Sequence, residues 1–211
     1  MEAPRALRPP PEAPSYIPGR STLYFPFAHN FATFIVEDYM NGHETNLEKA
    51  LLAGGCFWCM EALFKRVPGV VQVQSGYCGG SVSNPTYEQV CQNTTGHAET
   101  VEVSFDPSRI SYQRILEYFW KFHDPTTLNR QGADIGEQYR SVIFCLNESQ
   151  REIAQRSKSA AQRAFATPIV TSIEPAGTFW PAESWHQDYY AHNPDAPYCR
   201  FVIAPKVAKW A

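Results

Sequence analysis

A strand candidate runs into a helix candidate through two glycines in Ala50-Leu51-Leu52-Ala53-Gly54-Gly55-Cys56-Phe57-Trp58-Cys59-Met60-Glu61. The apolar run predicts a buried strand over 49–53, and the spacing that follows predicts a helix over 56–66. Val67-Pro68-Gly69 ends that helix, because proline and glycine do not continue it. The stretch therefore places Cys56 at the start of a helix.

The start of a helix favours an anionic sulfur. Its first turn carries unpaired N–H groups and the positive end of the helix dipole, which lower the pKa of a cysteine thiol. Cys56 is therefore the candidate nucleophile, with a buried and inert structural cysteine as the alternative. Phe57 and Trp58 offer a hydrophobic wall beside the sulfur and predict a substrate with a small apolar part.

Cys56 and Cys59 form a Cys-x-x-Cys, which is typical of a redox pair or of half a zinc site. A zinc site needs a second pair of cysteines or histidines at similar spacing. The remaining candidates offer no such pair; they are Cys78, Cys91, Cys145, Cys199, His29, His43, His97, His123, His186 and His192. We expect neither a metal nor an organic cofactor.

Strands and helices alternate along the rest of the chain. The patterns predict further strands over 70–77, 98–105, 137–146 and 169–173, helices over 110–123, 147–165 and 183–192, and a turn-rich loop over 76–85. This alternation predicts an α/β (α+β) fold, a two-layer sandwich with a mixed central sheet and a ferredoxin-like core. Both ends of the chain are expected to be long irregular segments.

The N-terminal region has an unusual composition. Seven of the 17 prolines precede residue 27, so residues 1–20 are predicted to form a poorly ordered, proline-rich arm. Residues 21–211 are expected to form one domain with a mobile C-terminal segment around 193–211. Five aromatic residues are predicted to pack on that domain: Tyr24, Phe25, Phe27, Phe31 and Phe34.

Composition and charge exclude several classes of partner. A net charge of −3 and a pI near 6.1 argue against binding to nucleic acid or an anionic membrane surface. The sequence has no apolar run long enough for a membrane span, and its start lacks the core of a secretory signal. Six dispersed cysteines favour the reducing cytoplasm. Arg5 and Arg8 suit an organellar presequence, but the prolines around them disfavour one.

Several short stretches together resemble the peptide methionine sulfoxide reductase A family. They are Gly55-Cys56-Phe57-Trp58, Gly76-Tyr77 with Gly79-Gly80, Asn84-Pro85-Thr86-Tyr87, Gly96-His97-Ala98-Glu99, His123-Asp124-Pro125 and Gln138-Tyr139-Arg140-Ser141. The likeness runs in order from about residue 42 to residue 199. It implies a cytoplasmic, monomeric repair enzyme that reduces the S epimer of methionine sulfoxide, free or in proteins, with electrons from thioredoxin.

Reduction of a sulfoxide by a thiolate needs an acid, because the oxygen must be protonated or strongly hydrogen-bonded as the S–O bond breaks. Glu99 matches the family's glutamate in Gly-His-Ala-Glu. Burial beside the aromatic wall would raise its pKa so that it carries a proton near pH 7. The alternative for Glu99 is an exposed carboxylate at a strand edge.

The resemblance also implies roles for Tyr87, Tyr139 and Asp134. The two tyrosines match residues that hydrogen-bond the sulfoxide oxygen, and Asp134 matches an aspartate beside the pocket. Ordinary packing is the alternative for the tyrosines, and an Asx turn is the alternative for Asp134. His97 and His123 are expected to hold loops through ring hydrogen bonds.

The reaction would leave a sulfenic acid on Cys56, which a second thiol captures as a disulfide. Residues 193–199 resemble the family's C-terminal segment with its recycling cysteine, so Cys199 is the first candidate. The sequence departs from the commonest pattern, because many members have glycine where Cys59 stands and no cysteine follows Cys199. Three roles are therefore open for Cys59. It forms the disulfide with Cys56 directly, it exchanges a disulfide with Cys199, or it is buried and takes no part in recycling. A direct bridge is expected to strain the first helical turn.

Two other functions are open to the same residues. One is a thiol–disulfide oxidoreductase that uses Cys56 and Cys59, which would need neither Glu99 nor the tyrosines. The other is a non-catalytic module that holds methionine-containing peptides against Phe57 and Trp58. Thiolate chemistry at Cys56 separates the catalytic functions from the binding module.

Overall fold

The computed structural model describes residues 46–210. The predicted arm over 1–20 and the predicted packing of the aromatic residues between 21 and 40 lie outside the described residues. No helix among those described is long and apolar enough to cross a membrane.

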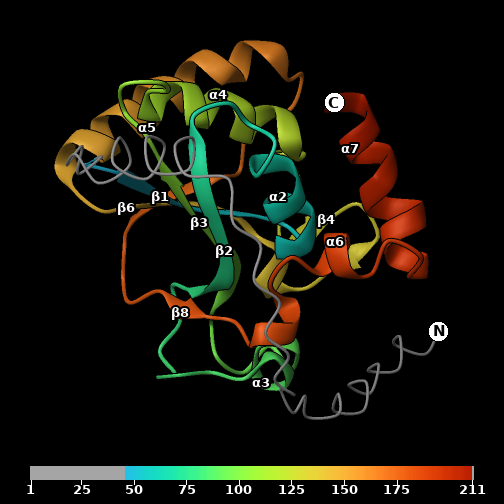
Figure 1. The fold of residues 1–211 in the computed structure, drawn as a ribbon. Coiled ribbons are helices and arrows are strands. Elements are labelled where there is room, and N and C mark those ends of the chain that lie inside the picture. The colour runs from blue at the N-terminus through green and yellow to red at the C-terminus, as the bar shows by residue number, and fades with distance from the viewer. Residues whose placement is uncertain (1–45, 211) are drawn as a thin grey trace, which may run out of the picture. The chain divides into compact units, whose positions relative to one another are not determined.

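A six-stranded sheet forms the centre of the described region (Figure 1). Its strands are β1 (Glu48–Gly54), β2 (Val70–Cys78), β3 (Ala98–Phe105), β6 (Ser141–Cys145), β7 (Ser172–Pro175) and β8 (Trp180–Pro181), in the spatial order β7-β6-β1-β3-β2-β8. All neighbours pair antiparallel except β6 and β7, which are parallel. The sheet is therefore mixed, as the sequence predicts.

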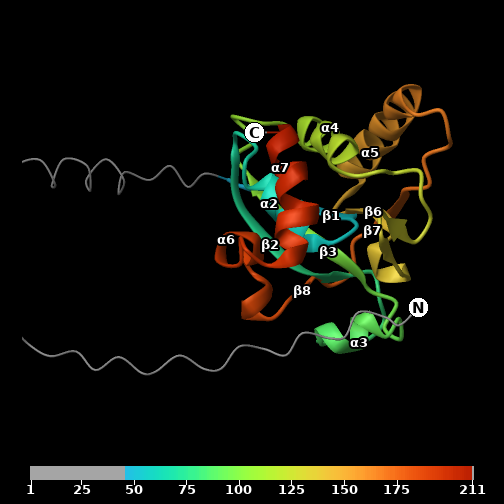
Figure 2. The ribbon, with the colours of Figure 1, turned by 90° about the vertical axis from the view of Figure 1, so that its right-hand side faces the viewer.

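Three helices cover one face of the sheet (Figures 1 and 2): α2 (Phe57–Phe64), α4 (Tyr112–Phe122) and α5 (Glu148–Ala161). The main core lies between them and inward-facing strand residues such as Leu52 and Val103. Ser111 caps α4, and Asn147 caps α5 by accepting the Gln150 N–H at 2.9 Å. Alternate strand residues, among them Leu51 and Phe144, form a smaller core on the opposite face.

Three predicted elements differ from the structure. The predicted strand over 137–146 begins as the 3₁₀ turn η1 (Glu137–Tyr139), because the Tyr139 N–H bonds to the Gly136 carbonyl at 3.1 Å. The predicted helix over 183–192 is split into η3 (Ser184–His186) and α6 (Tyr189–His192), since Asp188 takes a left-handed conformation with φ 54°. The last predicted strand is displaced from 169–173 to Ser172–Pro175.

The sequence patterns miss several short elements. These are α3 (Tyr87–Cys91), which starts with a capping box at Thr86, the hairpin of β4 (Arg130–Gln131) and β5 (Asp134–Ile135), strand β8, and the 3₁₀ turn η2 (Gln162–Ala164) that extends α5. Such elements span too few residues to show a clear hydrophobic period, except that η2 falls within the helix predicted over 147–165.

The C-terminal segment is helical in the structure. A π-helical turn, η4 (Cys199–Ile203), continues into α7 (Ala204–Trp210), and both contact α2. Figure 2 shows α7 lying in front of α2 and the sheet. The helices of this segment pack against α2 in the structure. The mobility expected for residues 193–211 stays a prediction.

Candidate active site

Cys56 lies in the turn between the central strand β1 and α2. It is the residue before the first helical residue, with φ −53° and ψ 122°, so the predicted helix start at 56 shifts to Phe57. Gly55 makes the turn possible: its φ is +90°, and a side chain there would approach Gln131 within 2.5 Å. The Cys56 carbonyl accepts the N–H groups of Cys59 at 3.1 Å and Met60 at 3.2 Å. The sulfur is thereby placed at the helix N-terminus.

Glu99 of β3 lies at the same helix end. Its carboxylate accepts the Phe57 N–H at 2.9 Å, and the residue is only 2% exposed. Burial raises the pKa of Glu99 to about 8, although the Phe57 N–H opposes the rise. An exposed carboxylate at a strand edge is therefore excluded. Glu99 is mostly protonated at neutral pH and can donate a proton beside Cys56.

The pKa of the Cys56 thiol differs from the sequence prediction. Burial raises it well above its ordinary value, and the neighbouring Cys59 and Glu99 raise it further. The expected lowering does not occur because the thiol is 94% shielded from water and Glu99 already takes the first free N–H of α2. Cys56 is therefore a protonated thiol at rest.

Cys59 lies in a different electrostatic setting within the same turn. Hydrogen bonding from Cys56 and the charge of Lys206 lower the pKa of Cys59 to about 7, against the effect of burial. The Lys206 ammonium donates to Cys59 Sγ at 3.7 Å, and the Tyr198 hydroxyl lies 3.9 Å from that sulfur. No group of three or more potential metal ligands occurs within 46–210.

The two aromatic residues after Cys56 differ in exposure. Phe57 is 1% exposed and stacks obliquely with Tyr87, with ring centroids 6.4 Å apart. Trp58 is half-buried and lies flat on Tyr189, with centroids 3.7 Å apart and planes 8° from parallel. Trp58 thus presents the accessible part of the hydrophobic wall.

Tyr87 and Tyr139 are both half-buried next to Glu99. Burial, followed by the charge of Glu99, raises the pKa of each phenol above its ordinary value. Both hydroxyls therefore stay protonated and can donate hydrogen bonds to an oxygen placed beside Glu99.

Asp134 is tied to the C-terminal segment. Its carboxylate accepts the Tyr198 hydroxyl at 2.6 Å, and its backbone belongs to β5. A tertiary hydrogen bond, and not an Asx turn, therefore uses this side chain. Tyr198 links Asp134 to the two sulfurs, because its hydroxyl also lies beside Cys56.

Cys199 is fully buried in η4, and its thiol has a raised pKa because of burial and the nearby charge of Cys59. Its element η4 contacts α2, which carries Cys59. Burial also raises the thiol pKa values of Cys78, Cys91 and Cys145, which suits packing residues and not reactive thiols.

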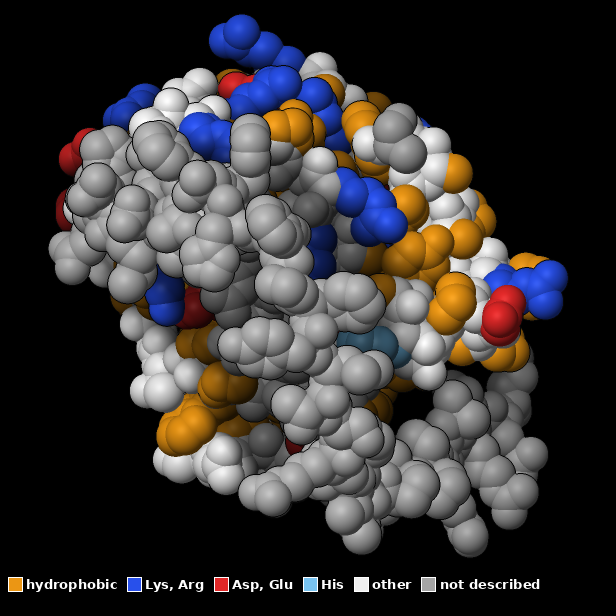
Figure 3. All heavy atoms as spheres, viewed as in Figure 1, with side chains coloured by type: hydrophobic (Ala, Val, Ile, Leu, Met, Phe, Trp, Pro, Cys, Tyr) orange, Lys and Arg blue, Asp and Glu red, His pale blue; other side chains and the backbone are white. Residues whose placement is uncertain are grey.

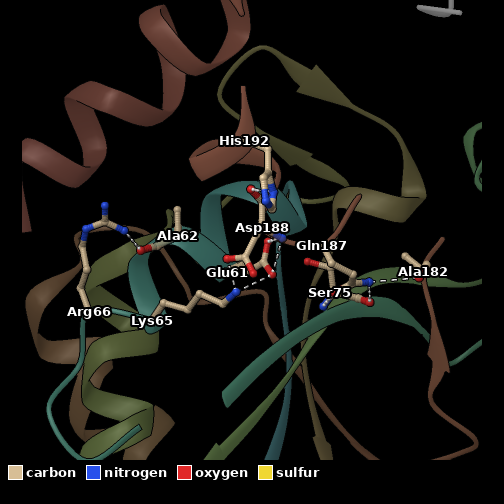
Figure 4. A network of polar contacts seen from close by, with 9 residues as sticks. All are labelled: Glu61, Ala62, Lys65, Arg66, Ser75, Ala182, Gln187, Asp188 and His192. Atoms are coloured by element: carbon tan, nitrogen blue, oxygen red, sulfur yellow. Dashed lines mark hydrogen bonds and ion pairs between the residues drawn. The ribbon is translucent and has the colours of Figure 1, made fainter. Parts of the chain in front are cut away.

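The segment from Ala182 to Tyr189 crosses over α2 and is held by two clamps (Figure 4). The Gln187 amide exchanges two hydrogen bonds of 2.9 Å with the Ser75 backbone. The buried Glu61 carboxylate accepts the Asp188 N–H, at 3.0 Å for each oxygen. The clamps fix His186, whose Nδ1 accepts the Trp58 indole N–H at 3.0 Å. The sequence analysis misses all of these partners, because none is adjacent to the residue it supports.

The two loop histidines have the contacts expected of them. His97 accepts the Gly80 N–H at 3.0 Å and bonds to the Val82 carbonyl at 2.8 Å. His123 bonds to the Phe119 carbonyl and to Ser141, both at 2.7 Å. Burial lowers the pKa of His123 to about 4, so its ring is neutral.

Comparisons with known proteins follow the same residues. The family model described as "Peptide methionine sulfoxide reductase" matches residues 48–211. Peptide methionine sulfoxide reductase MsrA 1 of Rhodopirellula baltica is 56% identical over 163 residues, 77% of this chain and 85% of that protein. MsrA of Nitratiruptor sp. is 57% identical over 163 residues, 77% of this chain and 94% of that protein.

Solved structures show the same likeness. Reduced Mxr1 from Saccharomyces cerevisiae superposes with a TM-score of 0.70 at 33% identity, covering 74% of this chain and 91% of Mxr1. Methionine sulfoxide reductase A of Corynebacterium diphtheriae gives a TM-score of 0.65 at 34% identity, over 74% of this chain and 80% of that one. This chain belongs to the peptide methionine sulfoxide reductase family.

Proposed function

We propose that this protein is a thiol-dependent oxidoreductase that reduces methionine (S)-sulfoxide, free or in proteins, to methionine. The contact that carries the proposal is the hydrogen bond from the Phe57 N–H to Glu99, which holds a protonated carboxyl beside the Cys56 sulfur. A thiol–disulfide oxidoreductase has no use for this acid.

The first half of the reaction uses Cys56, Glu99 and the two tyrosines. The Cys56 sulfur attacks the sulfoxide sulfur, while Glu99 protonates the oxygen and Tyr87 and Tyr139 donate hydrogen bonds to it. The attack forms an S–S bond to the substrate sulfur, and the S–O bond breaks as the protonated oxygen leaves as water. A water molecule then adds to the Cys56 sulfur as the S–S bond breaks, which releases methionine and leaves a sulfenic acid on Cys56. The substrate sulfur gains two electrons and Cys56 loses two, and Glu99 recovers a proton from the thiol through solvent.

The substrate methyl group would pack on the hydrophobic wall. Trp58 supports this role because it is accessible, while Tyr189 and the His186 hydrogen bond hold its indole in place. Phe57 is buried and would contribute the floor of the pocket. Asp134 and Tyr198 would form the side of the pocket that faces the C-terminal segment.

Recycling would begin at Cys59 and pass to Cys199. Cys59 lies three residues after Cys56 in the first turn of α2, and its N–H bonds to the Cys56 carbonyl at 3.1 Å. The expected strain of a direct bridge is reduced because Cys56 precedes α2, so bridging need not unwind the first helical turn. Cys199 belongs to η4, which contacts the helix that carries Cys59, and would then exchange into a Cys59–Cys199 disulfide.

Thioredoxin is the proposed reductant of that disulfide. Mxr1 from S. cerevisiae, a relative by structure, has been solved in complex with Trx2. Figure 3 shows hydrophobic side chains gathered on the face over α7. Exposed apolar residues in the C-terminal segment include Phe201, which is 76% exposed two residues after Cys199. A monomeric state and a cytoplasmic location complete the proposal.

We also infer that the core is a ferredoxin-like two-layer sandwich. The chain order β1-α2-β2-β3-α4-β6 and the antiparallel spatial order β6-β1-β3-β2 support this assignment. The helices lie on one face of those four strands (Figure 1).

Turnover of the separated epimers tests the function. The protein is incubated with each methionine sulfoxide epimer and dithiothreitol, and methionine is measured. We expect methionine from the S epimer alone. Disulfide reduction without methionine would support the thiol–disulfide oxidoreductase, and binding without either product would support the peptide-binding module.

A further inference from the structure

We propose that Lys206 is a catalytic residue of the recycling half of the reaction, where its ammonium holds Cys59 as a thiolate that attacks the Cys56 sulfenic acid. This inference rests on the proposed function and extends it to a residue of the C-terminal helix. It assigns α7 a chemical task besides packing.

The position of Lys206 carries the proposal. Ile203 and Val207 are buried and fasten this helix against the body of the protein, so the half-buried Lys206 between them projects toward α2. Its ammonium donates to Cys59 Sγ at 3.7 Å. No ion pair of Lys206 with a carboxylate occurs within residues 46–210. Among the described residues, no carboxylate therefore competes with the Cys59 sulfur for this ammonium.

The other groups around Cys59 do not supply a positive charge. The titratable and charged side chains that face it are Cys56, Glu99, Asp134, Tyr198, Cys199 and Lys206. Lys206 is the cation in this set, while Asp134 opposes the thiolate. Burial disfavours the charged form of this thiol, which is 3% exposed, and the charge of Lys206 opposes burial together with hydrogen bonding from Cys56, which lowers the pKa of Cys59 most.

The chemical step balances without a further reagent. Cys59 first loses its thiol proton to solvent. The thiolate then attacks the Cys56 sulfenic sulfur, the S–S bond forms and the S–O bond breaks. The leaving hydroxide takes one proton, supplied by Glu99 and restored from solvent, and departs as water. Lys206 keeps its proton and neutralises the thiolate before the attack.

Three variants separate the charge of Lys206 from the stability of α7. Lys206→Met removes the ammonium and keeps a similar length. Lys206→Arg keeps the positive charge. Lys209→Met is the matched control, because Lys209 lies one turn further along the same helix with its ammonium 5.2 Å from the Trp210 ring centroid.

Two rates are measured in a single turnover without external reductant. The first is the release of methionine, and the second is the loss of free thiols as the Cys56–Cys59 disulfide forms. Lys206→Met should slow disulfide formation about three- to tenfold relative to methionine release near pH 7, because the smaller fraction of Cys59 thiolate is only partly offset by its greater nucleophilicity. This loss should vanish as the pH rises above the thiol pKa of the variant. Lys206→Arg and Lys209→Met should follow the wild type.

Equal disulfide rates in Lys206→Met and the wild type across the pH range would overturn the role of Lys206. A loss that persists at high pH, or that Lys209→Met shares, would also overturn it, because either result points to packing. Failure of the proposed function itself is distinct: methionine would not be released in any of the proteins.

Discussion

The two sulfurs at the start of α2 lie within one helical turn of each other but in opposite electrostatic settings. Cys56 faces Glu99, and burial raises the pKa of its thiol. Cys59 is equally buried but faces Lys206, and its thiol has a pKa of about 7. Burial alone therefore does not decide the protonation of a thiol, because hydrogen bonding from Cys56 and then the charge of Lys206 oppose it at Cys59.

The difference separates the two halves of the proposed reaction. The side of the site built by β3 supplies a proton to the substrate oxygen. The side built by the C-terminal segment supplies a second thiolate. The variants below change one side at a time and compare the rates of methionine release and disulfide formation.

The largest effect is expected for Cys56→Ser. Turnover with methionine (S)-sulfoxide and dithiothreitol should fall below detection, because a hydroxyl lacks the acidity and nucleophilicity of the thiol. Circular dichroism should show an unchanged fold. Substantial methionine formation by this variant would contradict this role of Cys56 and would make Cys59 the nucleophile that attacks the sulfoxide.

Glu99→Gln should lower methionine release by about two to four decades, since the amide keeps the shape of the side chain without its acidic proton. The rate of methionine release in a single turnover measures this loss. Formation of the Cys56–Cys59 disulfide, which follows methionine release, should slow less. The hydroxide that leaves Cys56 in that step can take its proton from water. A loss of methionine release below about threefold would mean that Tyr87, Tyr139 or water protonates the oxygen.

Cys59→Ser and Cys199→Ser test the recycling side. With thioredoxin as reductant, each variant should lose at least about tenfold in turnover, whereas dithiothreitol should support both because a small dithiol reduces the sulfenic acid directly. After one turnover without reductant, Cys59→Ser should retain the sulfenic acid and Cys199→Ser should accumulate the Cys56–Cys59 disulfide. A Cys56–Cys199 disulfide in Cys59→Ser, with full thioredoxin-coupled turnover, would make Cys199 the direct resolving thiol.

Glu61→Ala is expected to have the smallest effect. It removes the acceptor of the Asp188 N–H and should lower the free energy of unfolding by about 1–3 kcal/mol. Urea denaturation measures this change. Glu117→Ala is the control, because the ion pair of Glu117 with Arg114 is exposed and should contribute little to stability. Equal losses in the two variants would show that the clamp on the 182–189 segment adds no special stability.

Much of the fold could be predicted because its strands and helices have clear periods. The alternation over 98–105 and the helical spacing up to His123 both correspond to observed elements, β3 and α4. The break at Asp188 in the helix predicted over 183–192 could not be predicted from periodicity. Its causes are the left-handed conformation of Asp188 and the hydrogen bond from the Asp188 N–H to the Glu61 carboxylate. The helices after Cys199 were missed because Pro205 and the short apolar spacing disguise them.

The candidate site was only partly predictable for a related reason. Cys56, Phe57, Trp58 and Glu99 belong to short stretches with a recognisable pattern, and the structure brings them together. His186, Tyr198 and Lys206 act through contacts with residues more than 60 positions away along the chain. The spacing of residues in the sequence carries no information about such contacts.

The central claim is that Glu99 is a protonated acid beside a protonated Cys56. The most direct test is the pH dependence of methionine release, measured in a single turnover at subsaturating substrate. Below about pH 8 Glu99 keeps its proton, so the rate should rise with pH as Cys56 ionises. Near pH 8 the loss of the Glu99 proton should cancel that rise and produce a plateau. Glu99→Gln should lack this bend and continue to rise until the thiol titrates. A bend near pH 8 that persists in Glu99→Gln would contradict the account.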